Sequence, residues 1–174
     1  MDARSQDHTS YDTHPHAHAE PHAASRMGIV EGTRILLVDD SRTIRESAHS
    51  LLEGSGCQLT LAENGFEALC QVAAVRPHLV FMDIAMPELD GFQACALIRS
   101  SVRHGKTPVV LVSANDGRVD RARAELVGAQ RYILKPFRKA DLLAAIRELL
   151  PAAWAQADVQ DDKQEDGNGP RAGD

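Results

Sequence analysis

The stretch LVFMDIAMPELDGF, residues 79–92, decides the fold. It opens with four apolar residues, reaches an aspartate, Asp83, and then enters a proline-containing loop. An uninterrupted apolar run this short, bounded by loop residues, is typical of a strand that is buried on both faces. The carboxylate at its tip is either a structural end-stop held by hydrogen bonds or a group presented for chemistry, and the rest of the chain has to distinguish the two.

Three further short apolar runs resemble this one, at residues 34–38, 108–113 and 131–134, and residues 57–62 alternate between apolar and polar residues as a strand does. A helical pattern follows every run, with Ser41 as the predicted N-cap of the first helix and Gly54 or Gly56 as its stop. The apolar residues at helical spacing are Ile44, Ala48, Leu51 and Leu52; Phe66, Leu69, Cys70 and Ala73; Phe92, Cys95 and Ile98; Val119, Ala122 and Leu126; and Leu142, Leu143, Ile146, Leu149 and Leu150. Strands that alternate with helices predict an α/β fold, a doubly wound five-stranded parallel sheet with five helices.

The chain ends differ in composition from this repeating part. Residues 1–29 hold five of the eight histidines, and we expect a disordered extension in which the run from His14 to His18 could bind a transition metal or simply be solvated. Residues 151–174 carry six acidic and two basic residues, which predicts an acidic and mostly disordered tail. Residues 27–150 hold 15 acidic and 15 basic residues, so the predicted domain, residues 30–150, has no basic excess to suggest DNA binding.

The cysteine pattern and the hydropathy both bear on whether the protein is cytoplasmic, secreted or inserted in a membrane. Cys57, Cys70 and Cys95 are odd in number, widely spaced and set in apolar segments, which favours reduced and buried thiols over disulfides. No run approaches the 18 or so apolar residues of a membrane span, and the N-terminal residues lack the apolar centre of a signal peptide. We therefore expect a cytoplasmic protein without membrane insertion.

Polar residues gather where the predicted strands end. The first strand leads into Asp39 and Asp40, the third ends at Asp83, the fourth at Ser113, and the fifth leads into Lys135. Ligands of doubly wound folds bind at this carboxyl edge of the sheet. Converging carboxylates favour a hard divalent cation such as Mg²⁺, and a lysine and a hydroxyl would complete the surroundings that a phosphoryl group needs.

The motifs RILLVDDS, FMDIAMPELDGF, VVLVSA and YILKPF resemble the receiver domain of two-component response regulators, over residues 34–150 or so. The resemblance implies a flavodoxin-like (βα)5 receiver fold and gives Asp83 the role of phosphoryl acceptor from a histidine kinase. It makes Asp39, Asp40, Asp83 and the backbone carbonyl of Ala85 the Mg²⁺ ligands. Lys135, next to a proline that usually follows a cis peptide bond, contacts the phosphoryl group, while Ser113 and Tyr132 form the switch.

Each of these residues also has an ordinary structural interpretation. One of the two aspartates after the first strand could be a helix cap, Lys135 a surface lysine, Ser113 a strand end and Tyr132 a side chain at the sheet edge. The resemblance further implies that the residues two places after the acceptor and after the switch hydroxyl, Ala85 and Asn115, set the lifetime of the phosphoryl group. Because Ala85 cannot orient water and Asn115 lacks a carboxylate, we predict slow self-dephosphorylation.

The chain most resembles single-domain receivers of type IV pilus and twitching-motility systems, whose kinase is of the chemosensory type. We expect output through a phosphorylation-dependent protein-binding surface, because the 24 residues after Leu150 are too few and too acidic for a DNA-binding module. This predicts a phosphoprotein that accepts a phosphoryl group and is not an enzyme in its own right, monomeric unless phosphorylation causes dimerisation.

Other functions stay open at this point. They are a flagellar-chemotaxis receiver, a phosphorelay intermediate and a phosphorylation-independent scaffold. A phosphatase of the haloacid-dehalogenase type also uses a strand-end aspartate with Mg²⁺, but it would need a second aspartate where Ala85 stands. A metal-storage role for the histidine-rich head would leave the strand-end residues without a function.

Overall fold

A computed structural model describes residues 29–150 of the chain, and the predicted N-terminal extension up to residue 28 and the acidic tail lie outside the described residues. The elements are β1 (Thr33–Val38), α2 (Arg42–Leu52), β2 (Cys57–Ala62), α3 (Gly65–Val75), β3 (Leu79–Asp83), α4 (Gly91–Ser100), β4 (Val109–Ser113), α5 (Arg118–Leu126), β5 (Arg131–Leu134) and α6 (Lys139–Leu149). Among residues 29–150, no helix is long and apolar enough to cross a membrane.

The five strands form one parallel sheet in the order β2-β1-β3-β4-β5. The chain moves outward from β1 to β2, returns to the other side of β1 as β3, and continues to β4 and β5. The strand order therefore reverses between β1 and β3, which is where ligands bind in doubly wound folds. The predicted five-stranded parallel sheet with helices on both faces is confirmed.

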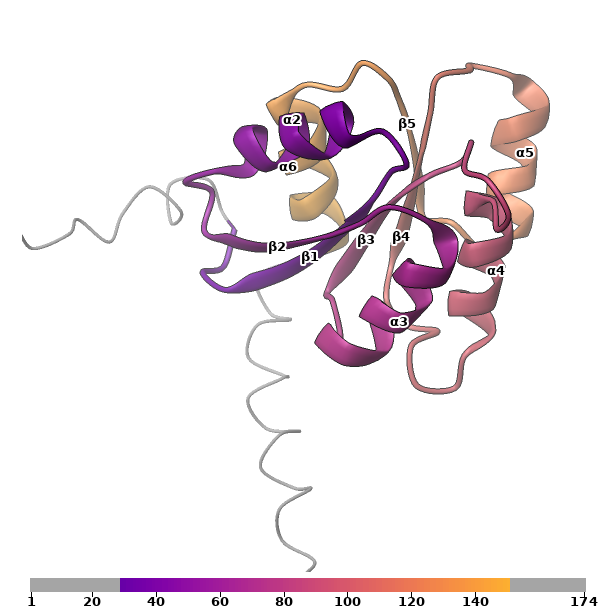
Figure 1. The fold of residues 1–174 in the computed structure, drawn as a ribbon, viewed down its shortest axis with the longest axis horizontal. Coiled ribbons are helices and arrows are strands. Elements are labelled where there is room, and N and C mark those ends of the chain that lie inside the picture. The colour runs from indigo at the N-terminus through magenta and orange to yellow at the C-terminus, as the bar shows by residue number, and fades with distance from the viewer. Residues whose placement is uncertain (1–28, 151–174) are drawn as a thin grey trace, which may run out of the picture.

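Helices cover both faces of the sheet (Figure 1). On one face α2 and α6 pack over the strand residues Ile35, Leu37, Phe81 and Val110, whereas on the other α3, α4 and α5 pack over the alternate residues Leu36, Val38, Met82 and Leu111. The three central strands are almost entirely buried, because their side chains point alternately into two apolar cores. This explains why their sequences read as uninterrupted apolar runs.

The predicted inward face of α3 is wrong in part. Phe66 is 54% exposed, and Cys70 and Ala73 are exposed as well, while Ala68 and Val72 face the sheet. The helix, GFEALCQVAAV, is apolar nearly all round, so hydrophobic spacing alone could not select a face. The residues of α3 that are buried are Gly65, Ala68 and Val72.

The prediction for the thiols and for α5 needs a similar correction. All three cysteines are free, but only Cys95 is buried, Cys57 is half-buried and Cys70 is exposed. In α5 the core contact comes from Ala124, whereas the predicted residues Val119, Ala122 and Leu126 are all exposed. Their spacing describes a helix correctly, yet the apolar side of that helix faces away from the core.

Candidate phosphoryl-acceptor site

Two neighbouring strands bring the acidic residues together. Asp39 follows directly after β1 and Asp83 is the last residue of β3, and the two strands pair with Val38 opposite Met82. The backbone N–H of Asp39 donates to the Ala62 carbonyl at 3.1 Å, which extends the pairing of β1 with β2 by one residue. Asp39 and Asp83 are 2% and 3% exposed, whereas Asp40 next to them is exposed.

Lys135 joins the two buried carboxylates. Its Nζ lies 2.6 Å from Oδ2 of Asp39 and 2.8 Å from Oδ1 of Asp83. The backbone N–H of Lys135 donates to the Ser113 carbonyl at 2.7 Å, so the end of β4 holds the residue in place. The peptide bond to Pro136 is cis, as the resemblance implied. The lysine is thus a partly buried cation shared by two acids.

The buried surroundings shift the pKa values of the site. Burial raises the pKa of the Asp83 carboxyl, and the nearby Asp39 and Asp40 add to the rise, although the hydrogen bond and charge of Lys135 oppose it. For Lys135, burial acts to lower the pKa, but hydrogen bonds to Asp39 and Asp83 and their charges outweigh it, so the pKa is raised. Lys135 therefore stays a cation at neutral pH, and the Asp83 carboxyl has little solvent around it.

The acidic cluster fits a hard divalent cation. Asp39, Asp40 and Asp83 each offer a carboxylate oxygen, and these oxygens lie within 4.8 Å of one another. Two ligands of one octahedral Mg²⁺ lie about 3–4 Å apart, because each Mg–O bond is about 2.1 Å. The oxygen-only donor set and its spacing suit Mg²⁺ after a small contraction. Asp39 also acts as a turn acceptor, since its Oδ1 accepts from the backbone N–H of Ser41 at 3.0 Å.

Ser113 and Tyr132 lie on the β4–β5 side of this cluster. Ser113 is 5% exposed, and its Oγ accepts from the backbone N–H of Asn115 at 3.0 Å. The hydroxyl of Tyr132 donates to the Asn115 carbonyl at 2.5 Å, and the Arg121 guanidinium lies 4.9 Å from the centre of the tyrosine ring. Both residues named as switch candidates therefore contact the same short segment that follows β4.

The loop after Asp83 folds back to start α4. The backbone N–H of Gly91 donates to the Ile84 carbonyl at 3.0 Å, and Asp90 caps the helix by accepting from the N–H of Gln93 at 2.7 Å. Ala85, whose carbonyl was predicted to bind the metal, lies exposed in this loop. A Cβ atom on Gly91 would lie 2.1 Å from the Asp83 carbonyl oxygen, so only glycine allows this approach.

Gly91→Ala is therefore expected to lower the free energy of unfolding by about 2 kcal/mol, because the methyl group would push α4 away from the tip of β3. Urea unfolding checks this. Gly117→Ala is the matched control, since a Cβ there would lie 3.3 Å from the Asn115 side-chain nitrogen and meet no backbone. Equal stabilities of the two variants would contradict the close approach of α4.

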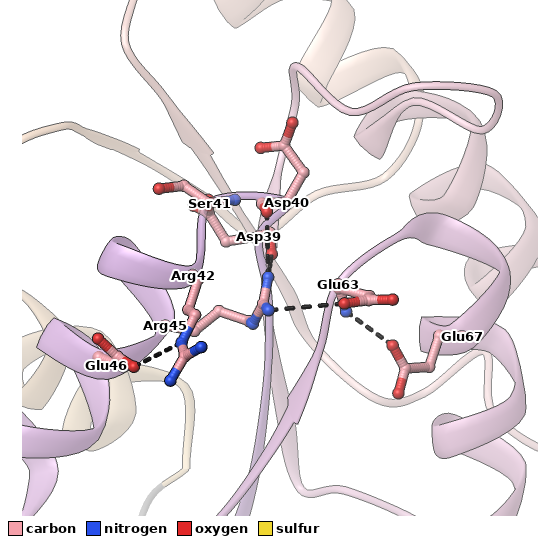
Figure 2. A network of polar contacts seen from close by, with 8 residues as sticks. All are labelled: Asp39, Asp40, Ser41, Arg42, Arg45, Glu46, Glu63 and Glu67. Carbon is pink, nitrogen blue, oxygen red and sulfur yellow. Dashed lines mark hydrogen bonds and ion pairs between the residues drawn. The ribbon is translucent and has the colours of Figure 1, made fainter.

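The structure also involves a residue that the sequence had not singled out. Arg45, in the first turns of α2, donates from Nη1 to the carbonyl oxygens of Asp39 at 2.7 Å and Asp40 at 3.1 Å (Figure 2). The sequence offers one indication of this role, because Arg45 lies one turn into the helix that follows the acidic pair. Its partners are backbone carbonyls, which the side-chain pattern does not reveal.

Comparisons with known proteins agree with this geometry. Residues 35–147 match the family described as the response regulator receiver domain. The chain is 43% identical to the protein PilG of Pseudomonas aeruginosa over 122 residues, which cover 70% of this chain and 90% of that protein. It is 37% identical to the response regulator MprA of Mycobacterium avium over 127 residues, and there it spans only 55% of the relative's length.

Solved structures give the same result. The chemotaxis protein CheY4 of Vibrio cholerae superposes with a TM-score of 0.65 at 27% identity, over 68% of this chain and 99% of that one. The receiver domain of a sensor histidine kinase from Pseudomonas aeruginosa, solved with a magnesium ion coordinated in its active site cleft, gives 0.63 at 29% identity, over 68% and 97%. The chain is thus similar both to a chemotaxis protein and to the receiver domain of a sensor histidine kinase.

Proposed function

The chain belongs to the family of response regulator receiver domains, and on that premise we propose that it is a single-domain response regulator phosphorylated on Asp83. One observation carries the proposal. The Asp83 carboxylate is buried at the tip of β3, 2.8 Å from the Lys135 ammonium and beside the carboxylates of Asp39 and Asp40. A mere end-stop would not need a cation-binding cluster and a shared lysine at the same strand tip.

The chemistry follows from these positions. An oxygen of Asp83 attacks the phosphorus of a phosphohistidine, the P–N bond breaks, and the histidine nitrogen leaves with the bonding electron pair. Lys135 donates hydrogen bonds to a phosphoryl oxygen and offsets part of its negative charge. Asp39, Asp40, Asp83 and the Ala85 carbonyl would hold Mg²⁺, which supplies further neutralisation of the phosphoryl oxygens when bound. The product is an acyl phosphate on Asp83, so the chain is a phosphoryl acceptor whose own catalysis is limited to gaining and losing that group.

Signalling then requires two states of the segment after β4. Ser113 now accepts from Asn115, and Tyr132 donates to the same residue. A phosphoryl oxygen near β4 would accept a hydrogen bond from the Ser113 hydroxyl, and the movement of Ser113 toward it would change the position of residues 113–115, to which Tyr132 is bonded. A protein partner that binds the second arrangement better would convert phosphorylation into output by shifting the population.

The likeness to PilG supports a type IV pilus or twitching-motility pathway with a chemosensory histidine kinase. In this proposal residues 30–150 are the receiver, the flanking residues 1–29 and 151–174 are accessory segments, and the protein works in the cytoplasm without contacting DNA. A flagellar-chemotaxis receiver is the second candidate, because CheY4 has the same fold at 27% identity.

Phosphotransfer from a kinase tests the proposal. A chemosensory-type histidine kinase labelled on its phosphohistidine is mixed with the full chain and Mg²⁺, and the label is followed by gel. We expect the label to move from the kinase to this chain within seconds to minutes and to be retained on the kinase when a chelator is present. Label that stays on several such kinases despite bound Mg²⁺ would favour a phosphorylation-independent scaffold.

The lifetime of the phosphorylated chain is a further expectation. Ala85 has no polar side chain to orient water, and the Asn115 side chain donates to Asp120 at 3.2 Å and offers no carboxylate. After removal of the donor, we expect the acyl phosphate to persist for minutes or longer when followed by intact mass. Complete loss within a few seconds would contradict this, and Asn115→Asp is expected to speed the loss because it supplies a carboxylate at that position.

A further inference from the structure

Arg45 contacts the backbone of the acidic pair, and its side chain is largely buried although it lies near the start of an outer helix. Its side chain is 16% exposed, whereas that of Arg42, three residues earlier on the same helix, is 84% exposed. Figure 2 shows its guanidinium extending from α2 into the space between the Asp39–Asp40 turn and Glu63. A mainly buried guanidinium loses hydration, and hydrogen-bond acceptors or opposite charges must offset that cost.

Those partners are backbone atoms of the predicted metal ligands. The guanidinium donates to the carbonyl oxygens of both Asp39 and Asp40. Two bonds from one rigid group to consecutive carbonyls fix the orientation of the peptide units between them, and hence the direction in which the two side chains leave the backbone. In Figure 2 the Asp40 carboxylate points away from Arg45, so the arginine contacts the back of the pair and leaves that carboxylate free.

The same guanidinium connects the acidic pair to the end of β2. Its Nη2 lies 3.6 Å from Oε2 of Glu63. Glu63 is held in turn, because its backbone N–H donates to Oε2 of Glu67 at 2.8 Å in the first turn of α3. Arg45 therefore joins α2, the end of β1 and the start of α3 at one point beside the cluster of carboxylates.

We propose that Arg45 is a positioning residue for Mg²⁺ at the Asp39–Asp40–Asp83 site. It acts by orienting the backbone of Asp39 and Asp40 so that their carboxylates converge with that of Asp83. This inference rests on the proposed function, since it assumes that the cluster binds Mg²⁺.

The direction in which Mg²⁺ affinity changes when Arg45 is removed shows whether the residue acts by positioning the ligands or through its charge. A guanidinium near a divalent cation repels it, so if Arg45 acted through its charge alone, its removal would tighten Mg²⁺ binding. If Arg45 orients the ligands, its removal weakens binding, and groups that orient metal ligands from behind commonly change metal affinity by about 10–100-fold. A purely structural role would lower stability and leave the Mg²⁺ affinity unchanged.

The test is the dissociation constant for Mg²⁺, measured by calorimetric titration on the full chain for wild type, Arg45→Ala, Arg45→Lys and the control Arg42→Ala. Within residues 29–150, Arg42 pairs with Glu46 alone, on the solvent side of the same helix. We expect Arg45→Ala to raise the constant about tenfold, Arg45→Lys to lie between it and wild type, and Arg42→Ala to match wild type. Lysine recovers part of the effect because its ammonium can donate to these carbonyls, but it has no second nitrogen to keep the contact with Glu63 at the same time.

Thermal unfolding without Mg²⁺ accompanies each titration, and Arg45→Lys carries the test if Arg45→Ala does not fold. Unchanged or tighter Mg²⁺ binding by folded Arg45 variants would overturn the inference. Failure of the proposed function gives a different result, because the wild-type chain would then bind no Mg²⁺ at all.

Discussion

Asp83→Asn is expected to abolish phosphoryl uptake completely and, in Mg²⁺-free buffer at neutral pH, to make the folded chain more stable. The amide cannot form the acyl phosphate, whereas it fills the same buried volume without a charge. Lys135 remains paired, because its Nζ is also 2.6 Å from Oδ2 of Asp39. The two effects separate a chemical role for Asp83 from that of a structural end-stop, whose loss would reduce stability.

The stability gain should depend on pH with a defined sign. Burial raises the pKa of Asp83 in the folded state above its unfolded value of about 3.9, so the folded chain holds a proton more tightly. The wild type therefore pays the cost of an ionised, buried carboxyl fully above the raised pKa, and this cost disappears as the pH falls toward the unfolded pKa. Urea unfolding from pH 8 down to pH 4 should show the advantage of Asp83→Asn shrinking, and an advantage that grows toward acid would contradict this reasoning.

Lys135→Ala is expected to have the second large effect. Removal of the ammonium leaves Asp39 and Asp83 buried next to each other without a cation, which should cost about 3–5 kcal/mol of stability in the absence of metal. The variant should also take up phosphoryl groups about 100-fold more slowly, because a preorganised donor to the phosphoryl oxygens is lost. Urea unfolding and the time course of modification measure the two effects.

Mg²⁺ should recover part of the stability of Lys135→Ala, since the metal can neutralise the same carboxylates. Lys139→Ala is the matched control, because that ammonium donates to the Glu53 carbonyl at 3.3 Å on the exposed surface and contacts no carboxylate of the site. If Lys135→Ala were as stable as Lys139→Ala without Mg²⁺, the buried carboxylates would not depend on Lys135.

The sheet and the site cluster could be predicted because the strand sequences indicate both the burial of the strand and the polar residue at its end. Runs such as Leu79–Met82 are apolar without alternation, which requires cover on both faces, and the residue that ends each run is polar. Parallel strands bring such ends to one edge, so the sequence predicts that Asp39, Asp83 and Lys135 meet there. The structure places Nζ of Lys135 within hydrogen-bonding distance of both carboxylates.

Side-chain exposure on the outer helices was harder to predict. Phe66 and Cys70 have the spacing of a core face, yet Ala68 and Val72 are the buried residues, and in a helix that is apolar nearly all round periodicity cannot tell the two faces apart. Arg45 was missed for a related reason. Its partners are backbone carbonyls, which have no sequence signature of their own.

The most direct test of the account is intact mass of the full chain after incubation with acetyl phosphate and Mg²⁺, followed by mapping of the modified residue. The account predicts one added phosphoryl group on Asp83 of the wild type, none when a chelator removes Mg²⁺, and none on Asp83→Asn. Absence of modification in a wild-type chain shown to bind Mg²⁺, or an equal modification of Asp83→Asn, would contradict it.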